Sequence, residues 1–174
     1  MRALRFAIFA LPVLVAGCGY STNGSAPAGD YQWRSLYRQD VRTVAVPIFN
    51  TKSFNRGDEF RLTTAVAKQI EARTPYKLAP RERADTILEG EVVLSRVTTV
   101  SERYYTAQPQ EQLMVATVNF TWKDLRTGQI LVERRGFEDS ATYYPTLGEG
   151  RYYASQETAE RLAVAIVQEL QAEW

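Results

Sequence analysis

Apolar side chains recur with helical spacing in the first half of the chain. Leu62, Val66 and Ile70 stand four residues apart, with two alanines beside them. This spacing puts them on one face and predicts an amphipathic helix that packs against a core. Asp58 is in position to cap the start of the helix. Pro75 ends it, because the residue before a proline is displaced from helical backbone angles.

A second helical stripe lies near the C-terminus. From about Ser155 onward the apolar residues again fall on one helical face. They are Ala159, Leu162, Ala163, Ile166, Val167 and Leu170. We expect residues 140–153, which precede this helix, to form a loop. Both helices have one apolar face, so both can cover the same side of a sheet.

Alternating apolar and polar residues between the two helices predict β-strands. Residues 112–124 show the cleanest alternation. One face of this strand carries Met114, Ala116, Val118, Phe120 and Trp122. Residues 125–129 contain Gly128 and predict a short turn, so residues 129–139 return as an antiparallel strand.

Two less regular strands precede this hairpin. Residues 41–49 alternate, but Pro47 lies among them and cannot donate a ladder hydrogen bond, which predicts a free edge or a local bulge there. Residues 84–103 form a long β run in which Gly90 indicates a bulge or a close approach of another group. Residues 106–112 are polar and predict the connecting loop.

The predicted order β-α-β-β-β-α corresponds to a single α+β domain over residues 39–174. We expect a two-layer sandwich, in which a four-stranded, mostly antiparallel sheet carries both helices on one face. The other face meets water or a partner. Leu113 and Val115 make that face less polar than solvation alone requires, which hints at an interaction surface.

The N-terminus carries an export signal. Arg2 and Arg5 precede an apolar run over residues 6–15, and two small residues then lead to Cys18, the only cysteine. This segment resembles the signal of bacterial lipoproteins, in which residues 1–17 would be removed and Cys18 would receive a diacylglyceryl group and a further acyl chain such as palmitate. The apolar run is too short to span a bilayer. A plain secretory signal would leave an unpaired thiol in an oxidising compartment.

The segment after the lipidated cysteine predicts a flexible tether over residues 18–38, because small and polar residues dominate it. Gly19 follows the cysteine. In the enterobacterial sorting pattern an aspartate at that position favours the inner membrane. We therefore expect a lipid-anchored protein on the periplasmic face of the outer membrane.

Charge and composition exclude several classes of protein. Removal of residues 1–17 leaves 19 basic against 20 acidic side chains. A near-neutral chain argues against a nucleic-acid binder, which needs a clustered basic face. The single cysteine and the absence of histidine argue against disulfides and against the commonest metal ligand. We expect no metal and no cofactor.

The sequence predicts no catalytic site. Asp85, Glu89 and Glu91 are acid–base candidates, but such carboxylates on a strand normally remain solvated. A serine or threonine nucleophile needs a histidine or lysine base, and only Lys123 of the four lysines falls within the predicted sheet. Residues 148–150 lack the remaining glycines of a phosphate loop. We expect that the protein is not an enzyme.

Four segments of the chain carry a family resemblance. They are Cys-Gly-Tyr at residues 18–20, Val-Arg-Thr-Val-Ala-Val-Pro-Ile-Phe-Asn at 41–50, Glu-Phe-Arg-Leu-Thr at 59–63 and Ala-Asp-Thr-Ile-Leu-Glu-Gly at 84–90. Together they resemble the LptE family of lipopolysaccharide-assembly lipoproteins. The resemblance implies a non-enzymatic outer-membrane lipoprotein that assists assembly and plugging of the β-barrel LptD and the transport of lipopolysaccharide to the outer leaflet.

Tyrosine doublets and flanking arginines are the candidate ligand contacts. The candidates are Arg103, Arg151, Tyr104, Tyr105, Tyr143 and Tyr144. A guanidinium can bind a phosphate group with two hydrogen bonds, and tyrosine is common at interfaces that are partly apolar and partly solvated. The family resemblance implies that the phosphates of lipid A are the groups bound. The loop expected over residues 106–112 and the loop expected over residues 140–153 leave the same end of a β-meander, so we expect these two loops to lie close together. The alternative is that one ring of each doublet packs in the core and the arginines are solvated.

A second function stays open alongside the first. The protein could instead be a regulatory lipoprotein that activates a cell-wall synthase or another envelope secretion complex. Activators of this kind need a long stalk, whereas a flexible tether of residues 18–38 spans only about 25 Å. The short tether favours a partner that is held at the membrane.

Overall fold

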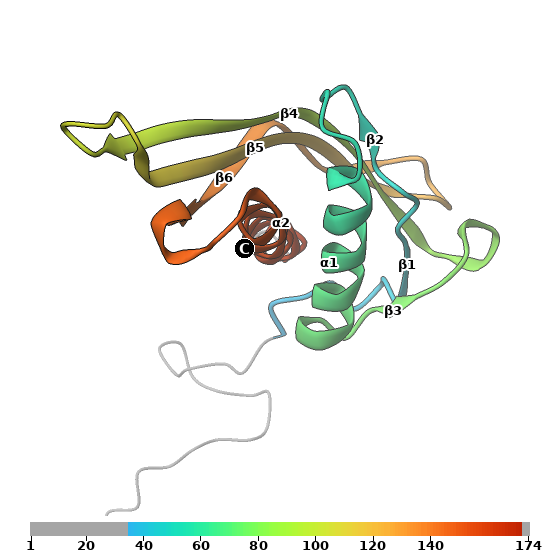
Figure 1. The fold of residues 1–174 in the computed structure, drawn as a ribbon. Helices are drawn as coiled ribbons and strands as arrows, with labels where there is room; N and C mark the ends of the chain where they lie inside the picture. The colour runs from blue at the N-terminus through green and yellow to red at the C-terminus, as the bar shows by residue number, and fades with distance from the viewer. Residues whose placement is uncertain (1–34, 172–174) are drawn as a thin grey trace, which may run out of the picture. The chain divides into compact units, whose positions relative to one another are not determined.

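Three long antiparallel strands form the body of the sheet. The computed structural model describes residues 35–171, and in it β4 (Thr86–Glu102), β5 (Pro109–Asp124) and β6 (Ile130–Tyr143) make a curved meander (Figure 1). The alternation predicted for residues 112–124 is confirmed, because Met114, Ala116, Val118, Phe120 and Trp122 are all buried. The predicted β5–β6 hairpin is confirmed as well.

Three short strands extend the sheet beyond β4. They are β1 (Thr43–Ala45), β2 (Asn50–Thr51) and β3 (Lys77–Leu78). The strand order is β3-β1-β4-β5-β6, β2 also pairs with β4, and all pairings of the short strands are parallel. The prediction of a four-stranded, mostly antiparallel sheet is therefore wrong in detail: the sheet has six strands and is mixed. The strand predicted over residues 41–49 is interrupted at Pro47, and β1 and β2 lie on either side of it.

Both helices lie on the same side of the sheet, as predicted (Figure 1). They are α1 (Asp58–Arg73) and α2 (Arg151–Gln168). The apolar stripes of both are buried between the helices and the sheet. In this part of the chain no helix is long and apolar enough to cross a membrane.

Three predicted boundaries need correction. Gly57 occupies the N-cap of α1 with a φ of 100°, so Asp58 is the first helical residue and not the cap. The loop predicted over residues 140–153 is shorter, because β6 continues to Tyr143 and α2 already begins at Arg151. The loop predicted over residues 106–112 ends where β5 begins, at Pro109.

The close approach predicted at Gly90 is present. A Cβ atom built on Gly90 would lie 2.4 Å from the ring of Phe49, and that ring is itself buried. Glycine is therefore required for Phe49 to pack on β4.

The first described residues of the chain contact the domain at Tyr76. The Tyr37 and Tyr76 ring centroids are 5.7 Å apart, and the Arg38 N–H donates to the Tyr76 hydroxyl at 3.0 Å.

Candidate functional site

The carboxylate of Asp58 joins three elements of the fold. It accepts a hydrogen bond of 2.7 Å from the Ser95 hydroxyl of β4 and another of 2.7 Å from the Ser155 hydroxyl of α2. Arg61, one turn further along α1, donates to it at 3.1 Å. These bonds hold the first turns of the two helices together and fix both to the sheet.

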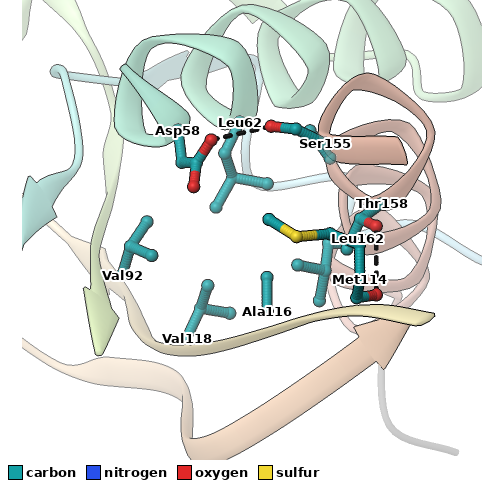
Figure 2. Close-up of a pocket in the computed structure, with 10 residues that line it drawn as sticks. Asp58, Leu62, Val92, Met114, Ala116, Val118, Ser155, Thr158 and Leu162 are labelled. Carbon is teal, nitrogen blue, oxygen red and sulfur yellow. Dashed lines mark hydrogen bonds between the residues drawn. The ribbon is translucent and has the colours of Figure 1, made fainter. Parts of the chain in front are cut away.

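An interior cavity lies beneath this junction. Figure 2 shows apolar side chains of the sheet and both helices pointing into it, with Asp58 at one side bonded to Ser155. The apolar residues around it include Leu62, Val92, Met114, Ala116, Val118 and Leu162. Its volume of about 20 Å³ is close to that of one water molecule. The cavity is therefore too small for an acyl chain.

A second pocket shares Asp58 and Ser155 with this cavity and opens to solvent. We call it the basic pocket. It is lined by Phe54, Asn55, Arg56, Asp58, Arg61, Arg151, Tyr152 and Ser155, and its volume is about 320 Å³. The loop before α1 and the first turns of α1 and α2 supply these residues. The basic pocket is large enough to hold a polar headgroup.

Three guanidinium groups border the basic pocket, and among residues 35–171 only one of them, that of Arg61, forms an ion pair. Arg61 is held between the Asp58 carboxylate and the Tyr152 ring, whose centroid lies 4.8 Å from the guanidinium carbon. Such a cation–π contact adds a further orienting interaction. Within residues 35–171, Arg56 and Arg151 form no ion pair. The pocket therefore carries two positive charges that no carboxylate of the described residues pairs with.

The hairpin between β4 and β5 presents another group of candidates. It projects past the helices (Figure 1), and at its tip Arg103 is exposed beside Tyr104 and Tyr105, whose side chains are 91% and 92% exposed. The two rings meet edge to face with centroids 5.0 Å apart. Ala107 closes the turn with a φ of 49°, and its N–H donates to the Arg103 carbonyl at 2.9 Å. A positive φ at alanine stores backbone strain in this turn.

The remaining doublet, Tyr143–Tyr144, divides between the core and the surface. Tyr143 is 4% exposed, packs with Met114 and Ala154, and donates from its hydroxyl to the Gln112 side chain at 2.6 Å. Tyr144 is partly exposed, and its backbone N–H donates to the Glu149 carboxylate at 2.8 Å. In this doublet one ring therefore belongs to the core.

The structure distributes the sequence-predicted candidates over separate places. Arg103, Tyr104 and Tyr105 share the hairpin tip, whereas Arg151 borders the basic pocket, to which no residue of the tip contributes. Sequence reasoning missed Arg56 and Arg61, which the fold brings to Arg151 and Tyr152. The exposed Tyr152–Tyr153 doublet beside Arg151 was the one signal in the sequence that pointed to this end of α2.

The acidic candidates for catalysis are engaged in structural contacts. Asp85 accepts hydrogen bonds from the backbone N–H groups of Arg42 and Thr43, and the Arg42 bond holds the pKa of the Asp85 carboxyl below its usual value. Glu89 pairs with Arg81 and Glu91 with Lys52. Over residues 35–171 no cluster of three or more histidine, cysteine or carboxylate side chains is arranged to bind a metal ion.

Comparison with protein families gives one match. The model of the LptE family, described as lipopolysaccharide-assembly, matches residues 41–173. This range runs from just before β1 past the end of α2, so it takes in both pockets and the projecting hairpin. A search among curated proteins found no match.

Solved structures with a similar fold come from several bacteria. The PelC dodecamer from Paraburkholderia phytofirmans has a TM-score of 0.51 at 18% identity, covering 78% of this chain and 93% of that one. A minor lipoprotein from Acinetobacter baumannii has a TM-score of 0.51 at 18% identity, over 77% and 98% of the two chains. Uncharacterized lipoprotein B from Nitrosomonas europaea has 0.53 at 10% identity, over 80% and 88%. At these identities the likeness concerns the fold alone.

Proposed function

The chain belongs to the LptE lipopolysaccharide-assembly family, and from this membership we propose that it assists the assembly and plugging of the β-barrel LptD and the transport of lipopolysaccharide to the outer leaflet. The observation that carries the proposal is the extent of the match, which covers every helix and strand of the domain. We propose further that the protein performs no catalytic step of its own. The engagement of its strand carboxylates in structural contacts supports this.

The membrane anchor is part of the same proposal. Cys18, the signal over residues 1–17 and most of the tether lie outside the described residues. We propose that cleavage before Cys18 and its acylation attach the domain to the periplasmic face of the outer membrane. Because Tyr37 and Arg38 already contact the domain at Tyr76, a tether that ends before Tyr37 would have slightly less reach than the sequence suggested.

The hairpin tip supplies a surface suited to a barrel wall or to lipopolysaccharide. Tyr104 and Tyr105 expose large amphipathic rings next to the exposed Arg103, and exposed tyrosines of this kind are typical of interfaces. We also assign Arg151, which borders the basic pocket, and Tyr144 to the lipopolysaccharide contact region, as contacts separate from the hairpin tip. Tyr143 would act only as a support, because its ring is buried.

Affinity purification of the tagged full-length chain from detergent-solubilised outer membranes tests the function. We expect recovery of a large β-barrel of the LptD type. Recovery of a cell-wall synthase in its place would favour the regulatory alternative and overturn the proposal. Membranes that contain the untagged chain, treated in parallel, identify proteins that bind the resin unspecifically.

Charge reversal tests the assigned lipopolysaccharide contacts. Arg103→Glu together with Arg151→Glu should weaken binding of labelled lipopolysaccharide at a stated salt concentration, because glutamate repels phosphate. The fold should be retained, since both arginines are exposed and exposed charges contribute little to stability. Equal binding by the parent and the double variant would remove both residues from the contact region.

A further inference from the structure

One edge of the sheet has features of a binding site for an extended polypeptide. β6 is the last strand of the sheet, and among residues 35–171 no strand pairs with its outer side. We propose that residues 137–143 of β6, which we call the open edge, bind an extended segment of a partner protein as an added strand, and that this segment presents one basic side chain between aliphatic ones. The inference adds a peptide ligand to the proposed function and does not depend on it.

The open edge turns backbone groups away from β5 at every second residue. The register between the two strands is unbroken along this segment. The Ser140 N–H donates to the Asp139 carboxylate at 2.7 Å, and the Ser140 carbonyl accepts from Arg161 of α2 at 3.3 Å. In an antiparallel ladder the residues that bond to the neighbouring strand alternate with residues that face outward. Glu138 and Thr142 therefore direct their N–H and C=O groups outward as well.

Side chains stand in for a missing strand at Ser140. A neighbouring strand would offer a carbonyl to its N–H and an N–H to its carbonyl, and here Asp139 and Arg161 supply the acceptor and the donor. The Arg161 bond is long, and Arg161 is exposed, so an incoming N–H can replace it. The Asp139 carboxylate, once released from the Ser140 N–H, would then be free to bind a cation.

The other half of β6 is protected against such pairing. Its register with β5 shifts at two places, and Gly136 has a φ of 64°. Three charged residues, Glu133, Arg134 and Arg135, precede this glycine. Bulges and charged side chains are the common protection of exposed edges. The open edge keeps a regular ladder geometry and so remains a template for strand addition.

A groove beside the open edge determines which side chains fit. It lies between β6 and α2 and has a volume of about 480 Å³. Its lining includes the aliphatic Val164 and Ala165 and the carboxylates of Asp139, Glu157 and Glu160. Alternate side chains of a strand point to the same face, so every second side chain of an added strand would lie over this groove.

The charges of the groove favour one basic side chain. Glu157 pairs with Arg161 and Glu160 with Lys68, each at 2.9 Å. Asp139 forms no ion pair within residues 35–171. One carboxylate is thus available to a lysine or arginine of the partner, next to the aliphatic part of the lining.

Charge also disfavours a second copy of the chain as the occupant. Two copies joined along the open edge would bring together Glu138 and Asp139 of both strands, and the segment contains no basic residue. Like charges on neighbouring strands destabilise a ladder. A basic partner segment avoids this repulsion.

Binding of a labelled peptide to the detergent-purified full-length chain tests the site. The probe is a seven-residue peptide, blocked at both ends, in which threonine alternates with valine, lysine and valine. It should slow hydrogen–deuterium exchange over residues 137–143 and leave residues 130–136 unchanged. Unchanged exchange over residues 137–143 would overturn the proposal.

Two neighbouring carboxylates supply a matched pair of variants. Asp139→Asn removes the charge that lines the groove, whereas Glu138→Gln removes the same charge from the opposite face of the strand. We expect Asp139→Asn to weaken peptide binding about five-fold and Glu138→Gln to leave it within about two-fold. A peptide with glutamine in place of lysine should bind the parent and Asp139→Asn alike. Equal binding of the lysine peptide by both variants would contradict the assigned charge pair.

Methylation of the peptide backbone distinguishes an added strand from side-chain contact alone. Two peptides are compared, each carrying N-methyl groups on one of the two alternating sets of residues. The set that faces β6 should lose binding at least ten-fold, while the other should stay within about three-fold, because only one set donates to the open edge. Equal loss or equal retention in the two peptides would overturn strand addition.

Sedimentation of the full-length chain without peptide tests the second copy. We expect no self-association that slows exchange over residues 137–143. Self-association with such protection would assign the open edge to a dimer and overturn the peptide assignment. None of these measurements involves the barrel or lipopolysaccharide, so a failure here is distinguishable from a failure of the proposed function.

Discussion

Replacing Asp58 with alanine should destabilise the domain more than replacing any exposed carboxylate. The variant removes the common acceptor of the Ser95, Ser155 and Arg61 bonds. It thereby separates the first turn of α1 from the first turn of α2 and from β4. The Asp58 side chain is 13% exposed, so water can replace only part of what is lost.

The expected magnitude follows from the bonds. A hydrogen bond to a charged group contributes about 1.5–3 kcal/mol, so the two serine bonds set a range of about 3–6 kcal/mol. The Arg61 ion pair adds about 0–1 kcal/mol because Arg61 is partly solvated. Since the basic pocket admits water to Ser155, we expect the lower part of the range, about 3 kcal/mol. For a domain of this size that corresponds to a decrease in Tm of about 9 °C.

Urea unfolding of residues 35–174 measures the effect. Glu89→Ala is the matched control, since Glu89 forms an exposed ion pair with Arg81 and its loss should cost less than about 1 kcal/mol. A double-mutant cycle of Asp58→Ala with Ser155→Ala should give a coupling energy of about 1 kcal/mol or more. A free energy of unfolding for Asp58→Ala within about 0.5 kcal/mol of the parent would refute the reasoning.

Four further predictions concern the core, the close approach, pH and the anchor. Leu62→Asp and Ile166→Asp each bury an unpaired charge and should lower the free energy of unfolding by several kcal/mol; unchanged thermal melts would show that these stripes do not face the sheet. Gly90→Ala should cost about 1–3 kcal/mol in urea unfolding because its Cβ would overlap the buried Phe49 ring, and a neutral effect would mean that the ring moves aside freely. The pKa of Asp85 is lowered in the folded state. The stabilising contribution of its carboxylate is therefore present above the unfolded pKa of about 3.9 and is lost as the pH falls through the lower folded value. Asp85→Asn should flatten the acid side of the plot of unfolding free energy against pH, and an unaltered plot would contradict this. Cys18→Ala should abolish incorporation of labelled palmitate, and incorporation at the parental level would disprove lipidation at this residue.

The long elements could be predicted because their own sequences carry the pattern. The alternation from Met114 to Trp122 and the helical stripes around Leu62 and Ile166 each extend over several residues, and burial against a core enforces each period. The close approach at Gly90 followed from the absence of a side chain within a β run. These features depend on local sequence and on the existence of a core.

The parallel part of the sheet could not be predicted in the same way. β1 and β3 contain three and two residues, which is too few to show a period. They pair directly with each other, although helix α1 separates them in the sequence. Tyr143 was expected to lie in the loop over residues 140–153. The packing of its ring with Met114 and Ala154 instead keeps it in β6.

The candidate site depends on contacts between residues that are distant in sequence. Asp58 bonds to Ser95 and Ser155, which lie 37 and 97 residues away, and nothing near Asp58 in the sequence indicates either partner. Arg56 and Arg61 become neighbours of Arg151 only when the two helices pack. Arg151 itself could be named because a tyrosine doublet marks its position.

The contrast between the meander and the short parallel strands has a kinetic consequence. β5 and β6 are joined by a turn of only a few residues, whereas the Thr86 hydroxyl of β4 reaches the Thr43 carbonyl of β1 across 43 residues of sequence. Closing a long loop costs more entropy than closing a short one, and non-local pairing slows folding. The meander should therefore form in the folding transition state and β1 should join afterwards. Truncation of Val118 would then slow folding, whereas truncation of Val44 would mainly accelerate unfolding.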